Sequence, residues 1–198
     1  MFFTRLAGYL RRQTIRIPAG ETLVPINGAL RFPFAPLPFL DSDDMKAILS
    51  NSYEIITCEF LRHRLTQGGI MLDVGSNVGY IVAWGASAAG TEGEVHLFDP
   101  LQECALRLER LIELNPNYRF ILNRLAVGDI EGQLELNVDI DGRSRQASFI
   151  QSDSKTIVRS VDIVRLDTYI QSHFGDPSRI QVLKIDVESY EFVVLRGL

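Results

Sequence analysis

The chain has 198 residues, 46% of them hydrophobic and 23% charged, which suits one globular domain with its own core. Its net charge of −5 argues against a nucleic-acid partner, since phosphate binding needs a basic stripe. No apolar run approaches the ~20 residues of a membrane span. Cys58 and Cys104 show no C-x-x-C spacing and predict reduced thiols in a cytoplasmic protein.

Residues 1–45 are predicted to form an N-terminal extension before a main domain at residues 46–198. Apolar residues at helical spacing near the start fit either a membrane-surface helix or a helix packed on the domain's own flank, and we favour the second. These residues are Phe2, Phe3, Leu6, Tyr9 and Leu10, with Arg5, Arg11, Arg12 and Arg16 around them. The proline-rich stretch 17–40 predicts short strands and extended coil.

Strands and helices alternate through the rest of the chain. One helix is expected from Asp41–Asp44 to about Leu65, and Gln133–Ile140 with Thr156–Val161 should form an antiparallel excursion. The other expected strands are 70–74, 95–98, one within 120–127, and 180–185; the other expected helices are 80–89, 101–114, 166–173 and one from about 189. This order predicts an α/β fold with a doubly wound, mostly parallel sheet.

A glycine loop, Asp73-Val-Gly75-Ser-Asn77-Val-Gly79, joins the first of these strands to its helix. Gly75 allows a tight turn close to a ligand, and Gly79 allows the helix to approach the strand. The G-x-G-x-x-G spacing of dinucleotide binding is absent. Asp73 would repel a pyrophosphate but attract the ammonium of a methionine moiety, which favours S-adenosylmethionine over a nucleotide cofactor.

Two further strand ends are candidate cofactor contacts. Asp99 ends the second strand, where an acid can accept hydrogen bonds from both ribose hydroxyls or cap the following helix. At the third strand end, the small residues Ala126 and Val127 would leave room for adenine, although Gly128-Asp129 also fits a simple turn.

The segment Lys184-Ile-Asp186-Val-Glu188 ends the strand at 180–185. Residues two apart in a strand share a face, so these three charges are expected to line up. Charges at the end of an apolar strand are costly unless they pair or meet a ligand. The alternatives are a catalytic cluster and a structural Lys184–Asp186 ion pair, and we favour the first.

The chain resembles FkbM-family methyltransferases over roughly residues 50–198. The resemblance rests on DVGSNVGY, HLFDP, NRLAVGD, VRLDTYI and above all LKIDVESYEFVVLRG. It implies a class I methyltransferase fold, S-adenosylmethionine as methyl donor, and O-methylation of a hydroxyl on a sugar, lipid-linked glycan or polyketide. It places Asp73, Gly75, Ser76, Asn77 and Gly79 in the donor loop, Asp99 at the ribose, and Glu54 near the cofactor.

The chain also departs from the family pattern. Ser189 stands where glycine is usual after the KIDVE acid, and Asp99 replaces a more usual glutamate. Strands that the family has after this point are absent from the sequence. The sheet is therefore expected to be truncated after its fourth core strand, with 180–185 as an exposed edge that needs a partner or a second copy.

The expected chemistry is methyl transfer from sulfonium to oxygen. Asp186 is the first candidate for the general base and Glu188 the second, with Lys184 orienting the carboxylate or the acceptor oxygen. No clear metal ligand set is present. The remaining alternatives are a binding module without catalysis and, less favoured, an NAD-dependent dehydrogenase.

Overall fold

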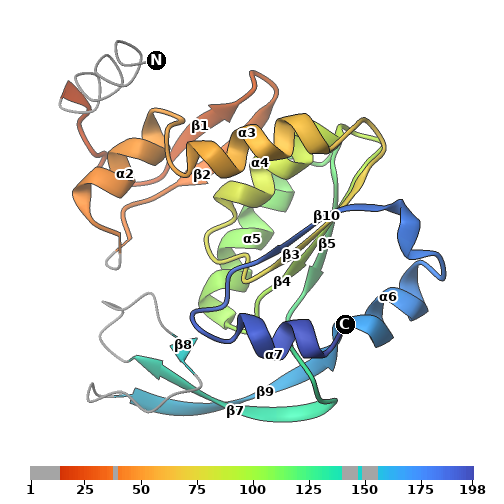
Figure 1. Cartoon of the computed structure of the whole chain (residues 1–198). Coiled ribbons are helices and arrows are strands. Elements are labelled where there is room, and N and C mark those ends of the chain that lie inside the picture. Colours follow the sequence, from red (N-terminus) through yellow and green to blue (C-terminus); the bar gives the residue numbers. More distant parts are fainter. Residues whose placement is uncertain (1–13, 38–39, 140–146, 149–155) are drawn as a thin grey trace.

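The centre of the computed structural model, which describes residues 14–37, 40–139, 147–148 and 156–198, is a four-stranded parallel sheet (Figure 1). Its strands are β3 (Ile70–Val74), β4 (Glu94–Phe98), β5 (Arg119–Asn123) and β10 (Ile180–Ile185). Their order is β10-β3-β4-β5, and every pair is parallel. The crossovers after β3 and β4 are α4 (Tyr80–Ala89) and α5 (Gln102–Leu114).

Both faces of this sheet are covered, because its strands alternate apolar side chains between two cores. Met71 and Leu97 point to the core shared with α4, α5 and α3 (Ile55–Arg64). Leu72 and Phe98 point to the core shared with α6 (Leu166–His173) and α7 (Glu191–Arg196). The predicted doubly wound α/β architecture is therefore confirmed.

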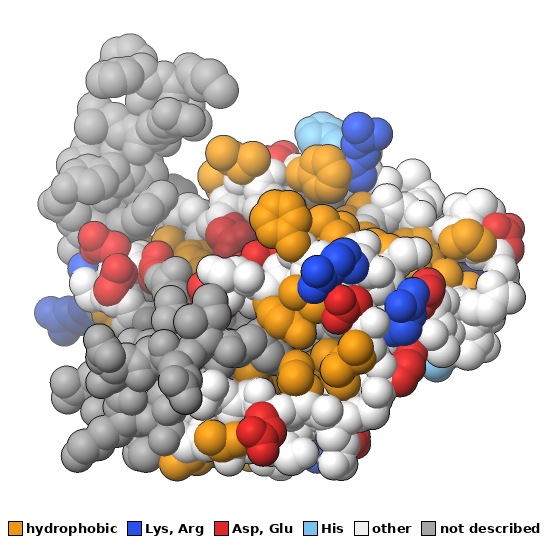
Figure 2. Space-filling model, turned by 60° about the horizontal axis from the view of Figure 1, so that its bottom comes forward, with side chains coloured by type: hydrophobic (Ala, Val, Ile, Leu, Met, Phe, Trp, Pro, Cys, Tyr) orange, Lys and Arg blue, Asp and Glu red, His pale blue; other side chains and the backbone are white. Residues whose placement is uncertain are grey.

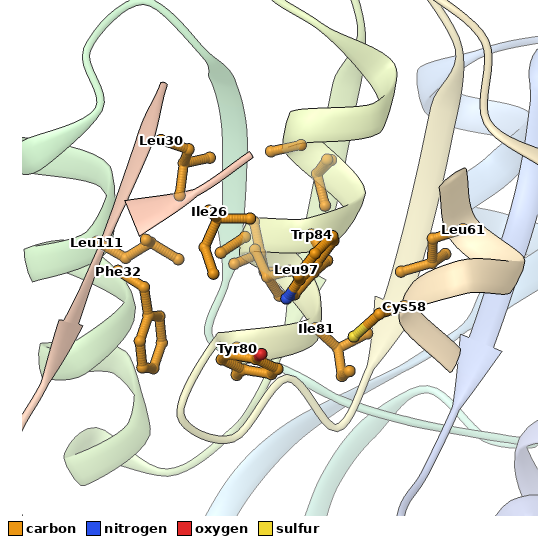
Figure 3. Packing of buried hydrophobic residues seen from close by; sticks show 14 of the residues in the cluster. Ile26, Leu30, Phe32, Cys58, Leu61, Tyr80, Ile81, Trp84, Leu97 and Leu111 are labelled. Atoms are coloured by element: carbon orange, nitrogen blue, oxygen red, sulfur yellow. The ribbon is translucent and has the colours of Figure 1, made fainter. Parts of the chain in front are cut away.

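The proline-rich stretch forms two short strands, as predicted, and these strands, β1 (Thr22–Ile26) and β2 (Leu30–Phe34), pair as a hairpin. Asn27 and Gly28 both have positive φ in the three-residue loop 27–29, a conformation that asparagine and glycine tolerate. Figure 3 shows Ile26, Leu30 and Phe32 of the hairpin directed toward side chains of α4 and α5. The hairpin thus shares the main core. The boundary at residue 45 stays a prediction, and the N-terminal helix expected at residues 2–10 lies outside the described residues.

The single helix expected to end near Leu65 is wrong. The segment forms α2 (Ser42–Leu49) and α3, separated by a turn in which Asn51 and Glu54 adopt left-handed backbone. Ser50 and Ser52 donate side-chain hydrogen bonds to the Ala47 carbonyl, which closes α2. Such local polar bonds compete with helix continuation, and the apolar spacing alone did not reveal them.

The third predicted strand is also divided. β5 ends at Asn123, and β6 (Ala126–Gly128) joins a second sheet of order β6-β9-β7-β8. In that sheet β7 (Gly132–Asp139) pairs antiparallel with β9 (Thr156–Arg165), as predicted. Strand β9 extends beyond the predicted end at Val161, and the remaining strand, β8, is Ala147–Ser148. A short 3-10 helix, Pro177–Arg179, leads into β10.

Helix α6 is fixed to β4 by a polar contact inside the second core. The buried His96 Nδ1 lies 2.7 Å from the Tyr169 hydroxyl oxygen, and His173 stacks on Tyr169 with ring centroids 3.9 Å apart. Burial lowers the pKa of His96, so the ring is neutral at neutral pH. Two histidines that lie far apart in the sequence therefore serve one structural contact.

Strand β10 lies at the edge of the parallel sheet: among the described residues it pairs with β3 and with no second strand. Helix α3, which contacts β10, exposes 80% of Ile56 and 50% of Phe60. The face shown in Figure 2 likewise carries apolar side chains in its middle, between charged ones. No helix in the described part of the chain is long and apolar enough to cross a membrane.

We expect the 198-residue chain, expressed alone, to self-associate, because an open strand edge beside exposed apolar side chains favours pairing. Ile56→Lys should reduce this association in sedimentation velocity. Leu106→Lys on α5, where the side chain is 56% exposed, is the matched control and should leave it unchanged. A stable monomer of the unaltered chain would contradict the expectation.

Candidate functional site

Three carboxylates stand at the carboxyl ends of adjacent strands. Asp73 lies near the end of β3, Asp99 follows β4 and Asp186 follows β10. The ladder places Lys184 directly beside Asp73, so their side chains share the face that carries α3 and α4. Ligands of open α/β sheets bind at these strand ends, which makes this edge the candidate site.

The glycine loop is tied to both neighbouring strands. The amides of Gly75 and Ser76 donate to the Phe98 carbonyl at 2.9 and 3.1 Å. Gly75 has φ +81°, and a Cβ there would lie 2.0 Å from the Asp186 carbonyl oxygen. Only glycine fits, because the loop passes directly over the end of β10.

The start of α4 also requires glycine, at Gly79. The residue in close contact with Gly79 belongs to α5, whereas the sequence predicted a close approach to strand β3. A Cβ on Gly79, at φ +81°, would lie 2.8 Å from Leu108 Cδ2 of α5. The close approach of α4 to β3 occurs at Gly85 instead, where a Cβ would lie 2.4 Å from Met71 Sδ. Gly79 therefore sets the packing of α4 against α5, and the predicted helix–strand role belongs to Gly85.

Asp73 is completely buried, and one of its two carboxylate oxygens lies at ion-pair distance from a cation. Its Oδ1 lies 3.1 Å from Lys184 Nζ, while Oδ2 has no hydrogen-bond partner among the described residues. Burial raises the pKa of the Asp73 carboxyl, and the Lys184 ammonium opposes that rise. An unsatisfied buried carboxylate oxygen is costly, so this atom is suited to a cationic or donating ligand group.

Asp99 connects the glycine loop to the start of α5. Its Oδ2 accepts from the Asn77 amide at 2.9 Å and its Oδ1 accepts from the Leu101 amide at 3.0 Å. The residue is 5% exposed, and burial raises the pKa of its carboxyl against these two hydrogen bonds. Each carboxylate oxygen has a second lone pair, so both bonds are compatible with a ribose contact.

The expected alignment of three charges is only partly right. Lys184 Nζ lies 3.6 Å from Asp186 Oδ2, and the Asp186 side chain is 59% exposed. Glu188 lies beyond the end of β10 with φ +46°, so it does not continue the strand face. Glu191, at the start of α7, accepts through Oε1 from the Val187 and Ser189 amides and thereby fixes this loop.

The remaining predicted contacts lie around this centre. Glu54 immediately precedes α3 and is exposed. Its negative charge helps to raise the pKa of Lys184, whereas burial of the lysine lowers it. Val127 is buried against β3 and β4 residues in the second core, and Ala126 is buried in the second sheet, where β6 pairs parallel with β9. Their role near adenine stays a prediction.

The sequence model of the methyltransferase FkbM domain matches residues 73–198, which is more than half of the chain. The chain belongs to the FkbM methyltransferase family. The matched region begins at Asp73 and includes Asp99, Lys184 and Asp186. The resemblance expected from the sequence motifs is therefore confirmed, and family membership implies S-adenosylmethionine as the methyl donor.

Two solved structures resemble this chain distantly. A candidate rRNA methylase from Clostridium thermocellum is 23% identical over 37% of this chain and 41% of its own, with TM-score 0.34. An S-adenosylmethionine-dependent O-methyltransferase from Thermotoga maritima is 14% identical over 56% of this chain and 44% of its own, with TM-score 0.35. The chain thus spans less than half of either protein. No curated protein matches it.

Left-handed backbone at residues other than glycine is concentrated around the candidate site. Among the described residues, six other than glycine have positive φ. Four of these are Glu54, Asn77, Glu188 and Ser189, which surround the strand ends of the site. Strained backbone persists where the surrounding structure enforces it, commonly at ligand sites. The sequence carried a signal for two of them: asparagine tolerates this conformation at position 77, and the family pattern has glycine at position 189.

We expect Ser189→Gly to raise the free energy of unfolding by about 0.5–1 kcal/mol. Ser189 has φ +73°, in the position where the family pattern has glycine, and glycine removes the left-handed strain at some entropic cost. Ser189→Ala keeps the strain and should give no gain. Urea unfolding of both variants measures the difference, and equal stabilities would contradict the assignment.

Proposed function

We propose that this chain binds S-adenosylmethionine at the carboxyl edge of β10, β3 and β4 and methylates a hydroxyl oxygen of a small molecule. The observation that carries the proposal is the glycine loop beside a buried carboxylate with an unused oxygen, Asp73 Oδ2, within the family-matched region. That oxygen suits the ammonium of the methionine moiety. A pyrophosphate would be repelled there, which disfavours a dinucleotide.

In this proposal the donor's ribose lies at Asp99, since the two amide hydrogen bonds hold that carboxylate rigidly at the end of β4. Gly75, Ser76, Asn77 and Gly79 shape the loop that follows the methionine part, and Glu54 adds negative charge from the start of α3. Ala126 and Val127 remain the proposed neighbours of adenine.

Asp186 is the proposed general base. S-adenosylmethionine supplies a strongly electrophilic methyl group, so the protein's task is to align the acceptor and accept its proton. The Asp186 carboxylate is largely exposed at the end of β10, where an acceptor can reach it, and Lys184 lies 3.6 Å away. Glu188, exposed in the next loop, is the second candidate.

The acceptor class rests on the family resemblance, which favours a sugar, glycan or polyketide-like hydroxyl. A binding module without catalysis is the principal alternative, and donor binding without turnover would select it. A screen of metabolites with methyl-labelled donor would separate the two functions and name the acceptor.

We expect calorimetry to show that the chain binds S-adenosylmethionine and not NAD. Asp99→Asn should weaken donor binding at least ~tenfold, because charge-assisted hydrogen bonds to ribose are worth ~1.5–3 kcal/mol each. Asp186→Asn is the matched control: donor affinity should stay within about twofold while turnover of the identified acceptor falls. Unchanged affinity in Asp99→Asn would contradict the ribose assignment, and binding of NAD alone would favour the dehydrogenase.

A further inference from the structure

Lys184 joins three separate parts of the candidate site. Its Nζ lies 3.1 Å from Asp73 Oδ1 on β3 and 3.6 Å from Asp186 Oδ2 beyond β10. The same atom donates to the Gly75 carbonyl of the glycine loop at 3.0 Å. The Gly75 contact is a hydrogen bond, and the two carboxylates lie at ion-pair distance. The ammonium is therefore held by groups of the protein itself, with Asp73 and Gly75 as its nearest partners.

Asp73 needs a cation to remain charged where it lies. It is fully buried, and the charged groups that act on it from the packed elements are Lys184 and Asp186 of the β10 segment. Asp99 at the end of β4 interacts with it as a further negative charge, and Glu54 at the start of α3 acts on Lys184. Burial and both neighbouring aspartates favour the neutral acid, whereas the Lys184 ammonium and, after it, the Ser76 side chain favour the carboxylate.

We propose that Lys184 is a positioning residue of the donor site: it keeps the buried Asp73 ionised and holds the Gly75 carbonyl, so that Asp73 Oδ2 and the glycine loop are preset for the donor. This inference rests on the proposed function and replaces the acceptor-orienting role expected from the sequence. Asp73 Oδ1 serves the internal cation and Oδ2 stays available to the donor's ammonium. Lys184 is then a part of the donor site that never touches the reacting atoms.

The consequence is a pH dependence that appears only when Lys184 is replaced. Without its ammonium, burial and Asp186 raise the pKa of Asp73 further, and the carboxyl takes up a proton as the pH falls. A neutral Asp73 no longer attracts an ammonium. Donor affinity of Lys184→Met should therefore fall with decreasing pH, relative to the unaltered protein.

Calorimetry with S-adenosylhomocysteine between pH 9 and pH 6 tests this. The ratio of the dissociation constant of Lys184→Met to that of the unaltered chain should increase at least ~tenfold over this range. Taking the ratio at each pH cancels the titration of the ligand's own amine. Lys184→Arg, which keeps the charge, and Lys46→Met, on α2 away from the site, should give ratios that do not change with pH.

A pH-independent ratio for Lys184→Met would overturn the proposal. Absence of S-adenosylhomocysteine binding by the unaltered chain would instead contradict the proposed function, and a second measurement then decides the role of Lys184. Carbon-13 NMR of the carboxyl groups of the unaltered protein should show Asp73 ionised at pH 7. A protonated Asp73 at that pH would overturn the proposal, whether or not Lys184→Met folds.

Discussion

The ion pair between Asp73 and Lys184 is the interaction on which the rest of the site depends. It joins two neighbouring parallel strands at their carboxyl ends, with the carboxylate fully buried, and its ammonium also holds the glycine loop. Breaking a buried pair by removing one partner typically costs about 3–5 kcal/mol. The same contact therefore contributes to the fold and gives the site its charge.

Much of this architecture could be predicted from the sequence because it follows from short-range patterns. Apolar runs predicted Ile70–Val74, which lies between two glycines, and Ile180–Ile185, and small residues predicted Tyr80–Ala89, each with the observed bounds. The loop Asp73–Gly79 was recognisable because its glycines meet backbone constraints that other residues cannot. Parallel pairing then brings the strand ends together, so Asp73, Asp99 and Asp186 could be grouped in advance.

The remaining features depend on long-range contacts that no local pattern carries. The only ion-pair partner that the sequence suggested for Lys184 was Asp186, two residues later in the chain, whereas the shorter contact runs from Lys184 across the ladder to Asp73. The division of the third strand follows from pairing of β6 with β9, which lies more than thirty residues later. The role of Gly79 against Leu108 required the packing of two helices to be known.

A double-mutant cycle on the free energy of unfolding tests the central claim most directly. Asp73→Asn, Lys184→Met and the combined variant are compared with the unaltered chain at pH 7. If the buried pair holds β3 and β10 together, the single changes are each costly, and the combined change costs at least ~2 kcal/mol less than their sum. Additivity within ~0.5 kcal/mol would show that the two residues act independently and would contradict the account.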